Sequence, residues 1–158
     1  MRKQPNSRMC FVCGMENPAG LKLSFFESGP GQAQAKWVAP DNFQGYPGVV
    51  HGGIVASLLD EVAGRAVMGG GQPRFMVTVT LDVKYRKPVP LGVDLHLSGR
   101  VIKDRGRLAQ VHSQLTLGDG SVAAEANVLL AHSPHSESDL SEADRLGWRV
   151  YPDDRPDD

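Results

Sequence analysis

The sequence has only two cysteines among 158 residues, too few for the disulfide framework of a small secreted domain. Its formal net charge is −1, so no overall field attracts nucleic acid or an anionic membrane. No apolar run approaches the roughly 20 residues of a membrane-spanning helix. The N-terminus, MRKQPNSRMC, lacks the apolar stretch of a secretory signal. These absences predict a cytoplasmic protein that binds neither nucleic acid nor membrane.

What the sequence does contain suits one ordinary globular domain. Its length is sufficient for a sizeable core, and the 41% of hydrophobic residues is typical of soluble domains. Residues 1–20 are predicted to be an irregular lead-in because proline and glycine interrupt them. Residues 21–132 form the predicted domain, and residues 133–158 are predicted to be a polar, mobile tail.

The apolar residues change period along this domain. Two-residue alternation predicts strands at 21–27, 32–39, 75–88, 93–104, 106–117 and 121–132. A helical pattern runs from His51 to Met68 and ends at Gly69-Gly70-Gly71. The order β-β-α-β-β-β-β therefore predicts an α+β fold, in which an antiparallel sheet packs on one long helix.

The stretch HGGIVASLLDE, residues 51–61, opens this helix and carries two adjacent acids. At 100° per residue, one broad apolar stripe contains Ile54, Val55, Leu58, Leu59, Val62 and Ala66. Asp60 lies roughly opposite, among small residues, which predicts close approach by another helix or by a ligand. Glu61 lies at the margin of the stripe and forms an i,i+4 pair with Arg65. The two acids are therefore not a catalytic pair.

Gly52 and Gly53 stand where the helix exposes unpaired N–H groups and the positive end of its dipole. Glycine allows a substrate oxygen to approach these donors closely, so the pair predicts an anion or oxyanion site. The alternative is that the glycines only permit a tight turn into the helix. No phosphate-loop motif accompanies them.

These motifs together resemble a known family. A His-Gly-Gly opening a long helix, an acid nine positions after the histidine, and a following LDVKYRKPVPLG are similar to the hotdog-fold acyl-CoA thioesterases. The resemblance is to the phenylacetate-degradation type and to the mammalian thioesterase-superfamily members. It covers about residues 10–132, and CFVCGMENPAGLKL is similar to the N-terminal segment of a subset. It implies a hotdog fold, a curved antiparallel sheet wrapped around a central helix.

The resemblance also implies a set of site residues for thioester hydrolysis. Asp60 would be the general base or the nucleophile, and Gly52 the backbone donor to the thioester carbonyl, with Gly53 beside it in the substrate site. His51 would support that loop, and Thr78 would orient the attacking water. An amide side chain from the preceding loop would be Gln44 or, alternatively, Asn42.

Helix geometry adds an inference that does not depend on the resemblance. The nine positions from His51 to Asp60 rise roughly 13–14 Å along a helix, and these two residues lie about half a turn apart; from Gly52 the rise is still about 12 Å. Gly52 and Asp60 of one chain therefore cannot both reach one carbonyl. A working site needs two subunits, which predicts a homo-oligomer, a dimer that pairs into a dimer of dimers.

Three basic residues, Lys84, Arg86 and Lys87, could bind the phosphates of coenzyme A. Solvated charges at a strand end explain them equally well. Cys10 and Cys13 could form half of a zinc site, but a structural zinc needs four ligands and the chain has no second pair. They could also be a redox pair. We expect two reduced thiols in an N-terminal loop, with no bound metal and no cofactor.

The sequence thus predicts an acyl-CoA thioesterase that acts on a small to medium acyl- or aryl-CoA. The alternative is a non-catalytic hotdog protein that binds an acyl-CoA or acyl ligand as a sensor. Asp60 favours hydrolysis, because a pure binder gains little from a buried carboxylate.

Overall fold

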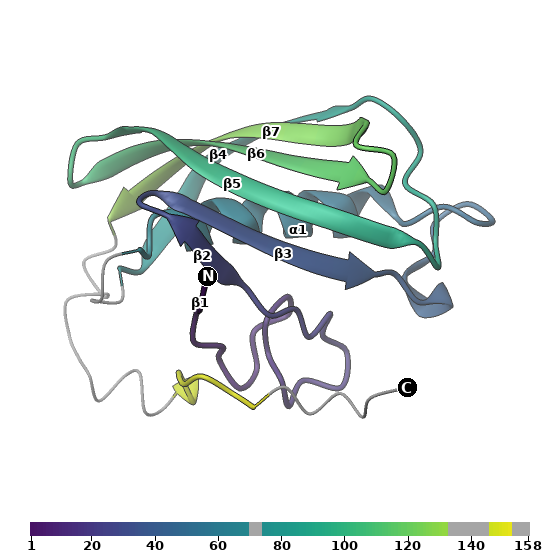
Figure 1. The fold of residues 1–158 in the computed structure, drawn as a ribbon, viewed down its shortest axis with the longest axis horizontal. Helices are drawn as coiled ribbons and strands as arrows, with labels where there is room; N and C mark the ends of the chain where they lie inside the picture. Colours follow the sequence, from purple (N-terminus) through teal and green to yellow (C-terminus); the bar gives the residue numbers. More distant parts are fainter. Residues whose placement is uncertain (70–73, 133–145, 153–158) are drawn as a thin grey trace.

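The computed structural model describes residues 1–69, 74–132 and 146–152. Within these ranges an antiparallel sheet of seven strands, in the order β1-β2-β3-β5-β6-β7-β4, curves over one long helix (Figure 1). The strands are β1 Arg2–Lys3, β2 Phe26–Gly29, β3 Gln32–Val38, β4 Met76–Tyr85, β5 Asp94–Asp104, β6 Leu108–Leu117 and β7 Val122–His132. The helices are η1 Asp41–Phe43 and α1 Gly52–Ala66. The predicted α+β fold is confirmed.

The predicted apolar stripe of α1 packs on the inner face of the sheet. Val55, Leu58, Leu59 and Val62 are at most 1% exposed, as expected for the core-facing side of an amphipathic helix. The helix approaches the sheet closely at Gly99 of β5. A Cβ there would lie 2.5 Å from the carbonyl oxygen of Val62, so only glycine allows this separation. The core therefore fixes the position of α1 and of the residues on its other faces.

The strand predicted at 21–27 begins only at Phe26. Leu21, Leu23 and Phe25 are buried alternately, which explains why the pattern looked like a strand. Their backbone partners, however, lie in the N-terminal segment: Leu21 N–H donates to the Phe11 carbonyl at 2.8 Å. Lys22 has a φ of 57°, a left-handed conformation that interrupts an extended strand. The prediction was wrong for these residues because burial, not sheet pairing, produced the alternation.

The predicted irregular lead-in contains a short strand, β1, which pairs with β2. A segment from the expected tail, residues 146–152, lies beside this lead-in (Figure 1). Asn6 and Arg149 exchange backbone hydrogen bonds of 2.8 and 3.1 Å, and Tyr151 is buried. The rest of the expected tail, and Gly70-Gly71 of the expected helix stop, lie outside the described residues. No helix in the described ranges is long and apolar enough to cross a membrane.

Candidate active site

The first turn of α1 presents one unsatisfied backbone donor. His51 is the N-cap residue, and its Nδ1 accepts a 2.9 Å hydrogen bond from Gly53 N–H. An accepting Nδ1 places the proton of the neutral ring on Nε2. Ile54 and Val55 donate to the His51 carbonyl. In the described part of the chain no group accepts from Gly52 N–H, so Gly52 carries the free donor at the positive end of the helix.

Tyr85 is a neighbour of this donor that the sequence analysis did not identify. Its hydroxyl donates to the Gly52 carbonyl at 2.7 Å, and the same hydroxyl oxygen is the nearest atom to where a Cβ of Gly52 would stand, at 3.6 Å, with ring atoms at 3.7 Å. Tyr85 therefore braces the helix start from β4. Its place in YRKPVPLG was the available signal, because that stretch already marked the end of the strand.

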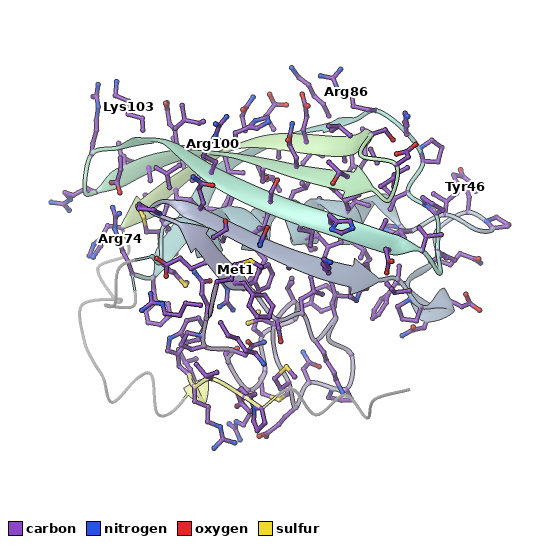
Figure 2. All side chains as sticks on the ribbon, in the orientation of Figure 1. Met1, Tyr46, Arg74, Arg86, Arg100 and Lys103 are labelled. Carbon is purple, nitrogen blue, oxygen red and sulfur yellow. The ribbon has the colours of Figure 1, made fainter. Side chains whose placement is uncertain are left out.

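An open cavity of about 910 Å³ surrounds this helix start. Its lining includes Gln44, His51, Gly52, Tyr85, Arg86 and Lys87. Gln44 Oε1 accepts a hydrogen bond from Gly48 N–H at 3.0 Å, so this oxygen shapes the loop that borders the cavity. In Figure 2, Tyr46 of the same loop lies at the right-hand end of the molecule and Arg86 at its upper edge, right of centre. Of the predicted site residues, the fold gathers five here.

The three candidate phosphate-binding residues separate in space. Arg86 and Lys87 line the cavity, whereas Lys84 does not. Arg86 also pairs with Glu125 at 2.8 Å, with about half of its side chain exposed. An exposed pair of this kind is weak, so the guanidinium remains available to an anion that enters the cavity.

Asp60 and Thr78 form the second half of the candidate site. Thr78 Oγ1 donates to Asp60 Oδ1 at 2.6 Å, so the predicted base and the predicted water-orienting hydroxyl lie side by side. Burial raises the pKa of the Asp60 carboxyl, the Thr78 hydrogen bond opposes this, and the nearby Glu61 charge adds to it. The carboxylate is therefore more basic than that of an ordinary aspartate, which favours its use as a general base.

A β-bulge lies next to Thr78. Thr78 pairs with Leu130 and Thr80 with Leu129, so Val79 is an extra residue in β4. Bulges twist a strand and redirect neighbouring side chains. Here the neighbouring side chain is that of Thr78, which donates to Asp60. Sequence alternation gave no sign of this irregularity.

The two halves do not meet within one chain. Asp60 does not line the cavity at Gly52, and eight helical residues separate them by about 12 Å along the axis. The surface beside Asp60 is uncovered: a Cβ on Gly64 would have no heavy atom within 4 Å, and Val77 and Val79 are 52% and 54% exposed. These valines belong to β4, whose outer edge has no partner strand in the described residues.

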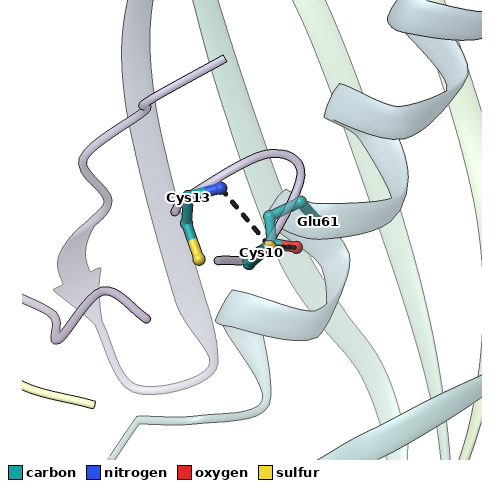
Figure 3. Close-up of side chains that lie close together, drawn as sticks. All are labelled: Cys10, Cys13 and Glu61. Carbon is teal, nitrogen blue, oxygen red and sulfur yellow. Dashed lines mark hydrogen bonds between the residues drawn. The ribbon is translucent and has the colours of Figure 1, made fainter. Parts of the chain in front are cut away.

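A separate cluster lies on another face of α1. Cys10 and Cys13 are free thiols, and they lie close to Glu61 (Figure 3). A hydrogen bond from the Cys10 thiol lowers the pKa of Cys13 to about 7, and the same sharing, together with burial, raises the pKa of Cys10. The predicted pair between Glu61 and Arg65 is confirmed at 2.9 Å.

Arg65 itself is buried, at 1% exposure. Its guanidinium carbon lies 4.9 Å from the Phe25 ring centre and 4.7 Å from that of Trp148, and Nη1 donates to the Pro5 carbonyl at 2.5 Å. Stacking between two rings and these hydrogen bonds compensate for burying the charge. Arg65 thus joins α1 to both the N-terminal segment and residues 146–152.

Comparison with known proteins identifies relatives of this fold. Residues 47–124 match the family model described as the thioesterase superfamily. Acyl-coenzyme A thioesterase THEM4 of Rattus norvegicus is 35% identical over 66 residues, 42% of this chain and 27% of that protein. The chain therefore spans about a quarter of the length of this relative.

Solved structures extend the similarity to most of the chain. A thioesterase superfamily protein superposes with a TM-score of 0.72 at 31% identity, over 78% of this chain and 63% of that one. A Streptococcus mutans protein bound to acetyl CoA has a TM-score of 0.64 at 22% identity, over 70% and 88% of the two chains. The predicted hotdog fold is confirmed.

Proposed function

Because the chain belongs to the thioesterase superfamily, we propose that it hydrolyses the thioester of a small to medium acyl- or aryl-CoA. The observation that carries this proposal is the 2.6 Å contact between Thr78 and Asp60, on a surface that a single chain leaves uncovered. A carboxylate with a raised pKa and an oriented hydroxyl beside it are the groups needed to position and deprotonate a water molecule.

The proposed reaction uses one half-site from each of two chains. Asp60 accepts a proton from water as the water oxygen attacks the thioester carbonyl carbon. Gly52 N–H of the other chain donates to the resulting oxyanion, at the positive end of α1. The tetrahedral intermediate collapses, the C–S bond breaks, and the coenzyme A thiolate takes up the proton. The products are a carboxylic acid and free coenzyme A.

We propose that the two chains pair through the outer edges of β4. This edge is ten residues long and has no partner strand in the described chain. Folded proteins normally cover or pair an edge strand of this length. A two-fold axis there would place two helices antiparallel, with Asp60 of each opposite the helix start of the other. Pairing of two such dimers would give the expected dimer of dimers.

The cavity at the helix start is the proposed coenzyme A site. Arg86 and Lys87 supply positive charge at its border, which binding of phosphate groups requires. The structurally similar Streptococcus mutans protein was solved with acetyl CoA bound.

Two free thiols suit a reducing compartment, so we propose that the protein acts in the cytoplasm.

A panel of acyl-CoAs tests the proposal. Short, medium, long and aryl substrates are compared by release of free thiol, with wild type, Asp60→Asn and Asp94→Asn. Asp94 is an exposed aspartate at the start of β5 and serves as the matched control. We expect Asp60→Asn to lose on the order of 10²-fold or more in turnover, with the control unchanged. Saturable acyl-CoA binding without hydrolysis by wild type would instead establish the sensor.

A further inference from the structure

The CFVCG stretch folds into a tight turn that brings its two sulfurs together. Cys13 N–H donates to Cys10 Sγ at 3.4 Å, and Cys10 N–H donates to Ser7 Oγ at 3.1 Å. Gly14 closes the turn with a 2.8 Å hydrogen bond to the Cys10 carbonyl. A Cβ on Gly14 would lie 2.2 Å from that oxygen, so the turn requires glycine. The thiols are held in place by the backbone that carries them.

Glu61 of α1 adds a third donor to this pair. Cys10 Sγ lies 3.7 Å from Glu61 Oε2, and the ligand atoms of Cys10, Cys13 and Glu61 all lie within 4.8 Å of one another (Figure 3). The other carboxylate oxygen, Oε1, accepts from Arg65 Nε at 2.9 Å. Arg65 therefore holds the Glu61 carboxylate so that Oε2 is directed at the sulfurs. Hydrogen-bonding groups outside the ligand set commonly orient metal ligands in this way.

The 3.7 Å separation of Cys10 Sγ and Glu61 Oε2 matches that of two donors around one small cation, and Cys13 Sγ lies within 4.8 Å of both. Tetrahedral zinc with Zn–S near 2.3 Å and Zn–O near 2.1 Å places neighbouring donors about 3.5–3.8 Å apart. We propose that Cys10, Cys13 and Glu61 bind a zinc ion that ties the N-terminal segment to α1. Two thiolates select a borderline-soft metal over magnesium or calcium, and a fourth position remains for water.

The charges around the cluster balance with zinc in place. Two thiolates and the carboxylate carry three negative charges, and the ion with the buried Arg65 guanidinium carries three positive ones. Binding releases the two thiol protons to solvent. Without the ion, the buried Arg65 charge has the Glu61 carboxylate as its ionic partner. A neutral assembly suits a site enclosed between a helix and a packed loop.

The proposed zinc site differs from the expectation that the cysteines bind no metal. That expectation counted ligands along the sequence and found two, whereas Glu61 lies 48 residues beyond Cys13 and was assigned only to the Arg65 pair. Because Glu61 directly follows Asp60, zinc would anchor the N-terminal segment to the helical turn that carries the proposed base. Three protein ligands with water in the fourth position make an open zinc site, and this site lies apart from the cavity at Gly52.

Metal content of the intact, reduced protein tests the site. The protein is purified without chelator, analysed for zinc, stripped, and titrated with zinc sulfate and with cobalt chloride. We expect about one equivalent per chain, because three ligands come from a single chain, and thiolate-to-cobalt charge-transfer absorption. Glu61→Gln, which still accepts from Arg65, should weaken zinc binding at least tenfold, since even supporting groups change affinity about 10–100-fold.

Two further variants complete the test. Glu16→Gln changes an exposed acid of the same segment and should bind zinc like wild type. Cys10→Ser should abolish the cobalt absorption; if it fails to fold, Glu61→Gln decides alone. No zinc uptake by reduced wild type would overturn the proposal. Half an equivalent per chain, unaffected by Glu61→Gln, would also overturn it, because four cysteines from two chains would then hold the ion. These readouts are independent of thioesterase activity.

Discussion

Mixing two inactive variants would show whether each site is built from two chains. Asp60→Ala removes the proposed base, and Gly52→Pro removes the proposed donor. Removal of a general base costs about 10²–10⁴-fold in rate, and removal of one oxyanion donor about 10²–10³-fold. Each variant alone should therefore be nearly inactive in the thiol-release assay.

Gly52→Pro suits the local backbone unusually well. Gly52 is the first residue of α1, the helical position that accepts proline best. His51 has φ −57° and ψ 133°, and this ψ lies within the range of about 120–160° that a residue before proline prefers. Gly52 N–H has no partner in the described residues, so its loss breaks no internal hydrogen bond. Gly52→Ala, which retains the N–H, is the control and should lose less activity.

The expected recovery follows from pairing statistics. Unfolded together in equal amounts and refolded, the two variants should form mixed dimers in about half of all pairs. Each mixed dimer has one site with an intact Asp60 facing an intact Gly52, and one site with both groups missing. Activity should therefore return to about a quarter of wild type. If both variants form dimers alone and the mixture stays inactive, the site lies within one chain and the shared-site reasoning is refuted.

Three other outcomes follow from the structure. Thr78→Val removes the hydrogen bond that lowers the Asp60 pKa, so the raised pKa should rise further and the acid limb of the pH–rate profile should move to higher pH; an unchanged limb contradicts the assignment of Asp60 as the titrating base. Gly64→Leu adds a bulky side chain where a single chain leaves open space, and sedimentation should show weaker dimers with helicity retained; an unaffected dimer places the interface elsewhere. Gly99→Ala forces a Cβ against the Val62 carbonyl, and urea unfolding should show a loss of about 1–3 kcal/mol.

The order of elements and the faces of α1 could be predicted from sequence because they depend on local period. Side-chain period distinguishes strand from helix within a few residues, so the long helix and the strands from β3 to β7 were identified close to their true bounds. The buried stripe of Leu58, Leu59 and Val62 was predicted for the same reason. The strand predicted around Leu23 was wrong because alternating apolar residues indicate burial, and a buried segment need not pair with a sheet.

Only part of the candidate site could be predicted from the local pattern of the sequence. The free donor of Gly52 and the placement of Asp60 away from the core follow from helix geometry and were predicted. The contact between Thr78 and Asp60 depends on a bulge in β4, and bulges leave no mark in the hydrophobic pattern. The resemblance to a family supplied Thr78; periodicity alone would not have selected it.

The sequence by itself determined which residues form each element and which side of α1 faces the core, because these properties are set by neighbours along the chain. Only the tertiary structure decided which distant residues meet. Glu61 reaches Cys10 and Cys13, and Arg65 stacks between two rings, because the N-terminal segment folds back onto α1. Such contacts depend on strand register and on how the chain folds back on itself. Both result from many weak interactions over the whole molecule.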